Sequence, residues 1–108
     1  MTRAVFRTAN GLLCGFSLSG HAGDGVRGED IVCAAISSAA YLTVNTLTDV
    51  CGCKAQPKQR DGFLQIELTG GDVQRGQDLL RGLKLHLEQL QEQYPKRIQV
   101  ESMEESVC

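Results

Sequence analysis

The sequence has few aromatic residues and no large excess of charge of either sign. Its 108 residues include no tryptophan, two tyrosines and three phenylalanines, so it lacks the aromatic platforms on which single-stranded nucleic acids stack. Eleven basic residues stand against thirteen acidic ones, a formal net charge of −2. That balance does not build the broad basic surface of most nucleic-acid-binding proteins. We expect no direct nucleic-acid binding, although the composition leaves a local basic patch open.

Targeting segments are also missing. Residues 1–7 lack the apolar core of a signal peptide, and we find no run close to the roughly 20 apolar residues of a membrane span. These absences favour a cytoplasmic protein that does not contact a membrane. In that compartment an odd number of cysteines is expected as reduced thiols, not as a disulfide framework. The five cysteines are Cys14, Cys33, Cys51, Cys53 and Cys108.

Length and composition predict one globular domain over residues 1–108. Hydrophobic residues make up 42% and charged residues 22% of the chain, as in ordinary globular proteins. A chain of this size can bury about two thirds of its unfolded surface, and it contains no repeat. The acidic segment 101–108 is expected to be a loose tail.

Periodicity predicts the order ββαβαβ. Apolar residues alternate in 4–8 and again in 12–19, and the Asn-Gly pair between them is typical of a two-residue hairpin turn. Helical spacing follows at 29–49, with an apolar stripe on one face. A loop at 51–61 then precedes a strand at 63–69. The stripe consists of Ile31, Val32, Ala35, Ile36, Ala39, Leu42 and Thr46.

The remaining residues complete an α/β fold. Asp72 is placed to cap a second helix, which ends at Pro95. Ile98 and Val100 suggest a short last strand. This order predicts a two-layer sandwich, with one mixed sheet and helices packed on it.

Cys33 and His21 are the candidate reactive residues. Cys33 lies near the start of the first predicted helix, away from its apolar stripe and on a polar edge with Asp30 and Ser37. The partial positive charge of a helix N-terminus stabilises a thiolate. His21 stands where the second strand meets the glycine-rich loop 20–28, from which its imidazole can reach the thiol. The competing interpretations are a small buried cysteine and a solvated loop histidine.

A longer motif surrounds these two residues. Gly20-His21-Ala22 is followed by a short loop and then by Gly-x-Asp-Ile-Val-Cys-Ala-Ala-x-Ser, which ends at Ser37. This pattern resembles the signature of the ribosomal-processing cysteine proteases, the Prp family, whose length and element order also agree. The resemblance implies a cytoplasmic homodimer that removes the N-terminal extension of a large-subunit ribosomal protein. It implies a cut after an apolar stretch that contains aromatic residues.

The resemblance also implies roles for the motif residues. Cys33 becomes the nucleophile and His21 the general base and acid. Gly20 lets the chain turn so that His21 points inward. Asp30 caps the helix, orders the loop or orients His21, and Ser37 hydrogen-bonds the thiol or the substrate. For Asp30 a plain helix cap and for Ser37 a small packing residue remain equally good interpretations.

Other candidate ligands do not form a recognisable metal site. Cys51-Gly52-Cys53 supplies two thiols, whereas a zinc site needs about four ligands. We interpret Cys14 as core packing and His86 as solvated, and we expect no cofactor or metal. The alternative function is a non-catalytic ribosome-associated binding or assembly factor with the same fold.

Overall fold

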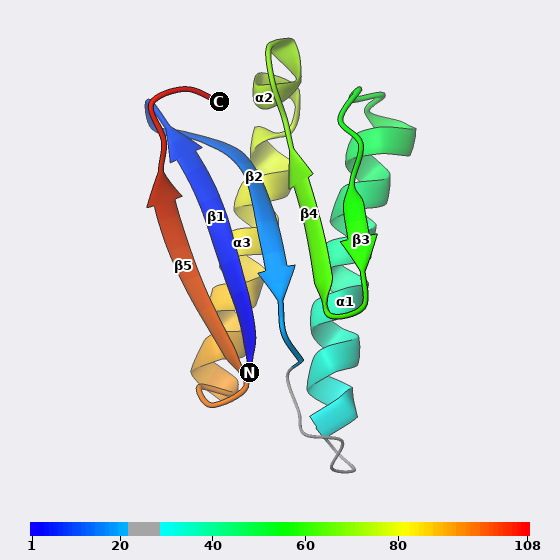
Figure 1. Cartoon of the computed structure of the whole chain (residues 1–108), viewed down its shortest axis with the longest axis vertical. Coiled ribbons are helices and arrows are strands. Elements are labelled where there is room, and N and C mark those ends of the chain that lie inside the picture. The colour runs from blue at the N-terminus through cyan, green and yellow to red at the C-terminus, as the bar shows by residue number, and fades with distance from the viewer. Residues whose placement is uncertain (22–28) are drawn as a thin grey trace.

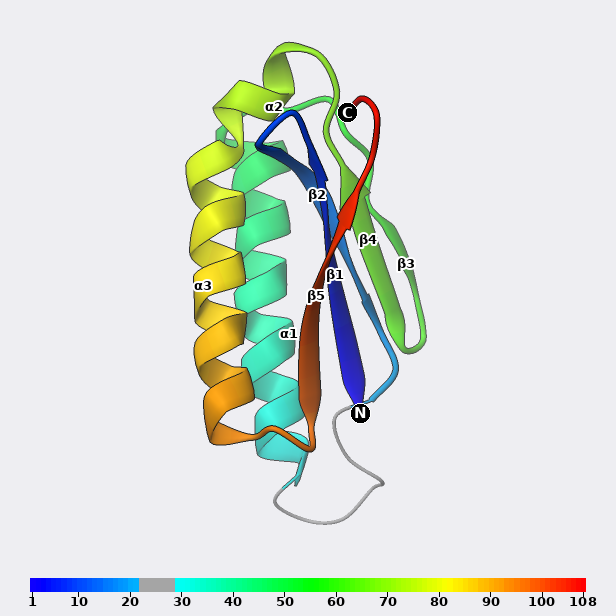
Figure 2. The same ribbon diagram turned by 90° about the vertical axis from the view of Figure 1, so that its left-hand side faces the viewer.

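The computed structural model describes residues 1–21 and 29–108, and of residues 29 and 30 only the backbone. It contains a mixed five-stranded sheet with the order β3-β4-β2-β1-β5, covered on one face by helices (Figures 1 and 2). This two-layer α/β arrangement confirms the predicted fold class. The elements are β1 (Thr2–Ala9), β2 (Leu12–Ser19), α1 (Glu29–Asn45), the π-helical turn η1 (Thr46–Val50), β3 (Lys58–Arg60), β4 (Phe63–Glu67), α2 (Gly71–Arg75), α3 (Gln77–Gln93) and β5 (Ile98–Glu104).

The first hairpin forms where the sequence predicts it. Asn10 and Gly11 both have positive φ, 53° and 78°, as the tight turn between antiparallel strands requires. The β1–β2 register shifts between Arg7 and Thr8. At this irregularity Leu13 and Cys14 are both buried, so the strict alternation expected at the start of β2 is wrong there.

Helix α1 buries part of the predicted stripe. Val32 and Ile36 are buried as expected, whereas Ile31 and Leu42 of the same stripe are each 69% exposed. The buried face is rotated toward residues outside the stripe, and it consists of Val32, Ile36, Ala40, Thr43 and Val44. Apolar and small residues surround most of this helix, so periodicity alone could not fix which side meets the sheet.

The segment Ile31–Val50 tests the expectation that the chain contains no run long and apolar enough to span a membrane. By length and composition it is apolar enough to cross a membrane, contrary to the sequence expectation that no run comes close. In the structure Ile36, Ala40 and Leu47 from this segment are buried in the hydrophobic core. One face of the segment is therefore packed into the core of the fold, and a third of the apolar window is buried.

The second predicted helix is divided at Gly76 into α2 and α3. Asp72 is not its cap, because the helix begins at Gly71 and Gly70 stands in the capping position. The Asp72 carboxylate instead accepts a hydrogen bond of 2.9 Å from the Lys54 N–H and pairs with Arg75 at 3.1 Å. The buried residues of α3 otherwise follow the predicted spacing.

Two segments expected to be irregular contain strands. Lys58–Arg60 is the edge strand β3, within the predicted loop 51–61. The acidic tail is not loose, because β5 continues to Glu104 and pairs in parallel with β1. Arg3 bonds Glu101 at 2.7 Å and Arg7 bonds Glu105 at 3.1 Å. The hydrogen bond from Arg3 lowers the pKa of the Glu101 carboxyl.

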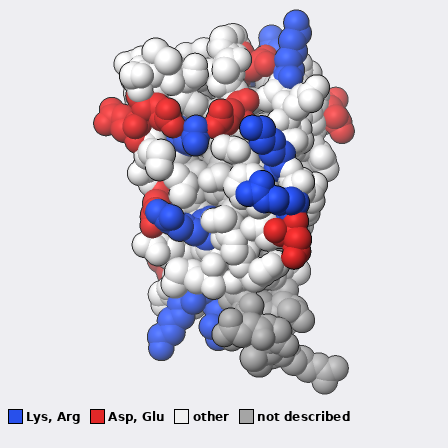
Figure 3. All heavy atoms as spheres, in the orientation of Figure 1, with Lys and Arg blue, Asp and Glu red and all other residues white. Residues whose placement is uncertain are grey.

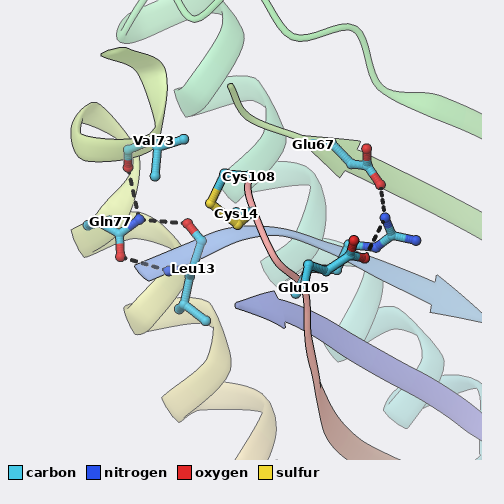
Figure 4. The surroundings of a disulfide bond; sticks show 8 residues. Leu13, Cys14, Glu67, Val73, Gln77, Glu105 and Cys108 are labelled. Atoms are coloured by element: carbon cyan, nitrogen blue, oxygen red, sulfur yellow. Dashed lines mark hydrogen bonds and ion pairs between the residues drawn. A yellow bond between two sulfur atoms is a disulfide. The ribbon is translucent and has the colours of Figure 1, made fainter. Parts of the chain in front are cut away.

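A disulfide joins Cys14 to Cys108, with 5.2 Å between the Cα atoms. Figure 4 shows the C-terminal segment crossing to the start of β2 to make this bond. The prediction of five reduced thiols is therefore wrong for these two cysteines, which are 94 residues apart. Beside the bond, the buried Gln77 amide accepts from the Leu13 N–H and donates to the Leu13 carbonyl (Figure 4).

Charges of both signs mix on the face seen in Figure 3. The orientation is that of Figure 1, in which the sheet lies in front of the helices. Arg7 of β1 also contacts Glu67 of β4, across the intervening strand β2. The positive charges of β1 are thus paired with acidic residues of β4, of β5 and of the segment that follows β5.

Candidate active site

Helix α1 supplies one wall of the candidate site. Cys33, Ser37 and Tyr41 are spaced by four residues, so they lie one above another on one side of the helix. All three line the same cavity. Cys33 is the fifth residue of α1, close to the positive end of the helix dipole. Its side chain is half-buried and also packs against the core.

His21 comes from the end of β2. Gly20, just before it, has φ +86°, a conformation that side chains other than glycine rarely adopt. A Cβ at Gly20 would also lie 2.5 Å from the Met1 carbonyl oxygen. The structure therefore requires glycine where the chain leaves the strand, which agrees with the turning role expected for Gly20.

The β3–β4 hairpin supplies the remaining wall. Its Gly62 carbonyl accepts a hydrogen bond of 2.9 Å from the Gly20 N–H, which ties the end of β2 to the hairpin. The Arg60 guanidinium lies 4.1 Å from the centre of the Phe63 ring. The Gln59 amide donates to the Tyr41 hydroxyl and so links the hairpin to α1.

These three walls enclose a cavity of about 140 Å³. Its apolar lining includes Leu18, Ile36 and Leu64, each less than one tenth exposed. Cys33 and His21 both line it, so the structure brings the predicted nucleophile and the predicted base to one pocket. The other lining residues are Thr2, Gly20, Ser37, Tyr41, Arg60, Gly62 and Phe63.

The other cysteines and the second histidine lie elsewhere. Cys53 is buried, and burial raises the pKa of its thiol, with the charges of Asp72 and Cys51 adding to the effect. A protonated thiol is a poor nucleophile and a poor metal ligand. Cys51 is half-buried outside the cavity, and His86 lies in the groove between α1 and α3. Over the described residues, no cluster of three or more His, Cys, Asp or Glu could hold a metal ion.

Sequence reasoning found the α1 and β2 walls but missed the hairpin. Ser37 lines the cavity as a motif residue should, whereas the side chain of Asp30 and the loop 22–28 lie outside the described residues. Arg60, Gly62 and Phe63 were not predicted as site residues. The Asp61-Gly62 pair is a turn signal and indicates a hairpin, yet nothing in the sequence places that hairpin beside His21.

A family model described as cysteine protease Prp matches residues 1–99. The chain belongs to the cysteine protease Prp family. This match confirms the family that the motif predicted, and with it the prediction of a cysteine protease. None of the curated proteins compared with the chain matches it significantly.

Solved structures agree with the Prp assignment. SMU.848 from Streptococcus mutans is 32% identical, with a TM-score of 0.82 over 97% of this chain and 96% of that one. The essential ribosomal processing protease Prp from S. aureus, in complex with a covalently linked product peptide, is 23% identical. It has a TM-score of 0.85 over 95% of this chain and 100% of its own. The same Prp with a substrate peptide has a TM-score of 0.84 at 22% identity, so these two show the shared fold.

Proposed function

We propose that this Prp family member removes the N-terminal extension of a large-subunit ribosomal protein, with Cys33 as nucleophile and His21 as general acid and base. One observation carries the proposal: among the described residues that line the 140 Å³ cavity, Cys33 is the only cysteine and His21 the only histidine. The chain contains just one other histidine, and it lies in a different groove.

The chemistry is acyl transfer through a thioester. The Cys33 thiolate attacks the scissile carbonyl carbon and forms a carbon–sulfur bond, while the imidazolium of His21 gives a proton to the leaving amine. The carbon–nitrogen bond then breaks and releases the mature protein with its new amino terminus, while the extension stays on Cys33 as the thioester until water releases it. Water gives a proton to His21, attacks the thioester and returns the thiolate. No cofactor or metal takes part.

We expect backbone groups of α1 to stabilise the oxyanion. Because the helix begins at Glu29, the N–H groups of its first turn have no carbonyl acceptor within the helix. Such groups hydrogen-bond the negative oxygen of a tetrahedral intermediate. The apolar cavity lining of Leu18, Ile36 and Leu64 suits the apolar side chains expected on the substrate.

A peptide assay tests the proposed reaction. The substrate is a peptide that carries an apolar, aromatic-containing N-terminal extension joined to the start of a mature large-subunit ribosomal protein. Mass spectrometry is expected to show one cut after the apolar stretch. A scrambled extension of the same composition is the control, and equal cleavage of both peptides would contradict the proposed specificity.

Alkylation tests the nucleophile independently of substrate. An ordinary thiol is only about 1% ionised at pH 6.5, so Cys51, which is also a half-buried thiol, serves as the comparison. We expect iodoacetamide to modify Cys33 at least about tenfold faster than Cys51, because the helix N-terminus and an imidazolium stabilise the thiolate. Equal rates would argue against an activated Cys33.

We further infer that the protein is a cytoplasmic homodimer, joined through the outer face of α1 and α3. Between these helices lies a groove of about 510 Å³, beside the exposed Leu42. Asp78 and His86 flank Gly82 on α3, four residues away on either side. A two-fold axis near Gly82 would set Asp78 of each copy opposite His86 of the other. This complementarity favours a second copy as the occupant of the groove.

Gly82→Arg tests the interface without disturbing the fold. No atom lies within 4 Å of a Cβ at Gly82, so the single chain has room for the new side chain, whereas a partner seated on the groove would clash with it. Sedimentation analysis is expected to show a dimer for the wild type and a monomer for Gly82→Arg. Gln99→Arg, at an exposed position of the edge strand β5, is the control. A wild-type monomer at micromolar concentration would refute the interface.

A further inference from the structure

The turn of the β3–β4 hairpin lies against the imidazole of His21. Gly62 in this turn has φ +70°. A Cβ built on Gly62 would lie 3.1 Å from Nε2 of His21, 3.6 Å from Cε1 and 3.7 Å from Cδ2. The tip of the ring therefore lies in tight contact with the place where any other residue would carry its first side-chain carbon, and it would have to give by a few tenths of an ångström.

The same glycine also holds the backbone that leads to His21. Its carbonyl oxygen accepts the 2.9 Å hydrogen bond from the Gly20 N–H, one residue before the histidine. Gly62 thus constrains His21 in two ways: its carbonyl holds the backbone of the preceding residue, Gly20, and its missing side chain leaves space for the ring. Neither contact contributes a reacting group.

We propose that Gly62 is a positioning residue for His21, an inference that rests on the proposed protease function. The His21 side chain is exposed, so a methyl group at position 62 would move the ring more readily than it would move the packed sheet. A misplacement of about 1 Å in a catalytic group can cost roughly 100-fold in rate, so a shift of a few tenths of an ångström is expected to cost several-fold. Substitution of Gly62 is therefore expected to harm turnover beyond its effect on folding.

A second glycine in the chain provides a matched control. Gly52 also has φ +70°, but no atom lies within 4 Å of a Cβ at that position. Gly62→Ala and Gly52→Ala therefore introduce the same backbone strain, and only the first adds a contact with His21. Gly62→Asn separates backbone strain from the contact with His21. Asparagine tolerates positive φ, as Asn10 does in this chain at φ 53°, so this variant adds the contact with less strain.

Steady-state kinetics and histidine NMR test the contact between position 62 and the His21 ring. We expect Gly62→Ala and Gly62→Asn to lower kcat by about three- to tenfold, with KM within about twofold of the wild-type value. Gly52→Ala is expected to keep the wild-type kcat. The chain has two histidines, so the Cε1–H signal of His21 should shift in both Gly62 variants while that of His86 stays in place.

The outcomes separate this inference from the proposed function. Equal kcat values for Gly62→Ala and Gly52→Ala, with an unmoved His21 signal, would overturn the positioning role even if the wild type is an active protease. An inactive wild type would refute the proposed function, and the NMR comparison would still test the contact. If Gly62→Ala does not fold, Gly62→Asn provides the same comparison with less strain.

Discussion

Replacement of Cys33 by alanine is expected to abolish cleavage of the extended peptide. Loss of the nucleophile removes the thioester route altogether, and kcat should fall by roughly 10⁴-fold or more, as in other proteases that lose this group. Because the Cys33 side chain is half-buried at the cavity wall, the smaller alanine should leave peptide binding largely intact. Cleavage rate and peptide affinity, measured on the same variant, check both statements.

Two further variants sharpen the Cys33 experiment. Cys33→Ser keeps the shape of the side chain but supplies a much weaker nucleophile, so it should bind the peptide without turning it over. Cys51→Ala removes a half-buried thiol outside the cavity and should retain full activity. Cleavage that survives Cys33→Ala would assign the reaction to another group. A wild type that binds the peptide without cutting it would favour the non-catalytic assembly factor.

Reduction of the Cys14–Cys108 disulfide is expected to produce the largest change in stability. The bond closes a loop of 94 residues, and its loss frees the unfolded chain from that constraint, at a cost of about 4 kcal/mol in the free energy of unfolding. Urea unfolding followed by circular dichroism, with and without a phosphine reductant, measures this difference.

Cysteine variants identify the bond responsible. Cys108→Ser should be about as stable as the reduced wild type and should not respond to reductant. Cys51→Ser, which changes a thiol outside the disulfide, should behave like the wild type in both buffers. If the purified wild type contains five titratable thiols and reductant has no effect, the original expectation of a fully reduced protein would be correct instead.

Local patterns in the sequence specify most of the fold. The Asn10-Gly11 turn is predictable because each residue tolerates positive φ, and the spacing of Leu80, Leu83 and Leu87 identifies the buried side of α3. The buried side of α1 is only partly predictable in this way, since Val32 and Ile36 of the predicted stripe are buried and two other members are not. Ile31 and Leu42 are as apolar as the core residues, and only the packing against the sheet decides that they face outward.

The features that the sequence could not predict, the disulfide and the hairpin beside His21, depend on contacts between residues far apart in the chain. Cys14 and Cys108 are at opposite ends of the chain, and a presumed reducing compartment argued against joining them. The motif around Cys33 and His21 predicted a reactive pair, and the cavity brings the two residues together. The role of Gly62 depends on the docking of a hairpin some forty residues away from His21, which no local pattern encodes.

Strand β2 runs from the disulfide at Cys14 to the cavity at His21. Cys14 lies near its start, and His21 follows its end seven residues later, about 23 Å away for an extended chain. Figure 1 shows the C-terminus at the opposite end of the sheet from the N-terminus, beside which the cavity opens at Thr2. A reducing buffer that keeps the Cys33 thiol unoxidised for the assay therefore also breaks the Cys14–Cys108 disulfide, which lies far from the cavity. Preparations handled in such a buffer should work normally at room temperature yet lose activity sooner on warming.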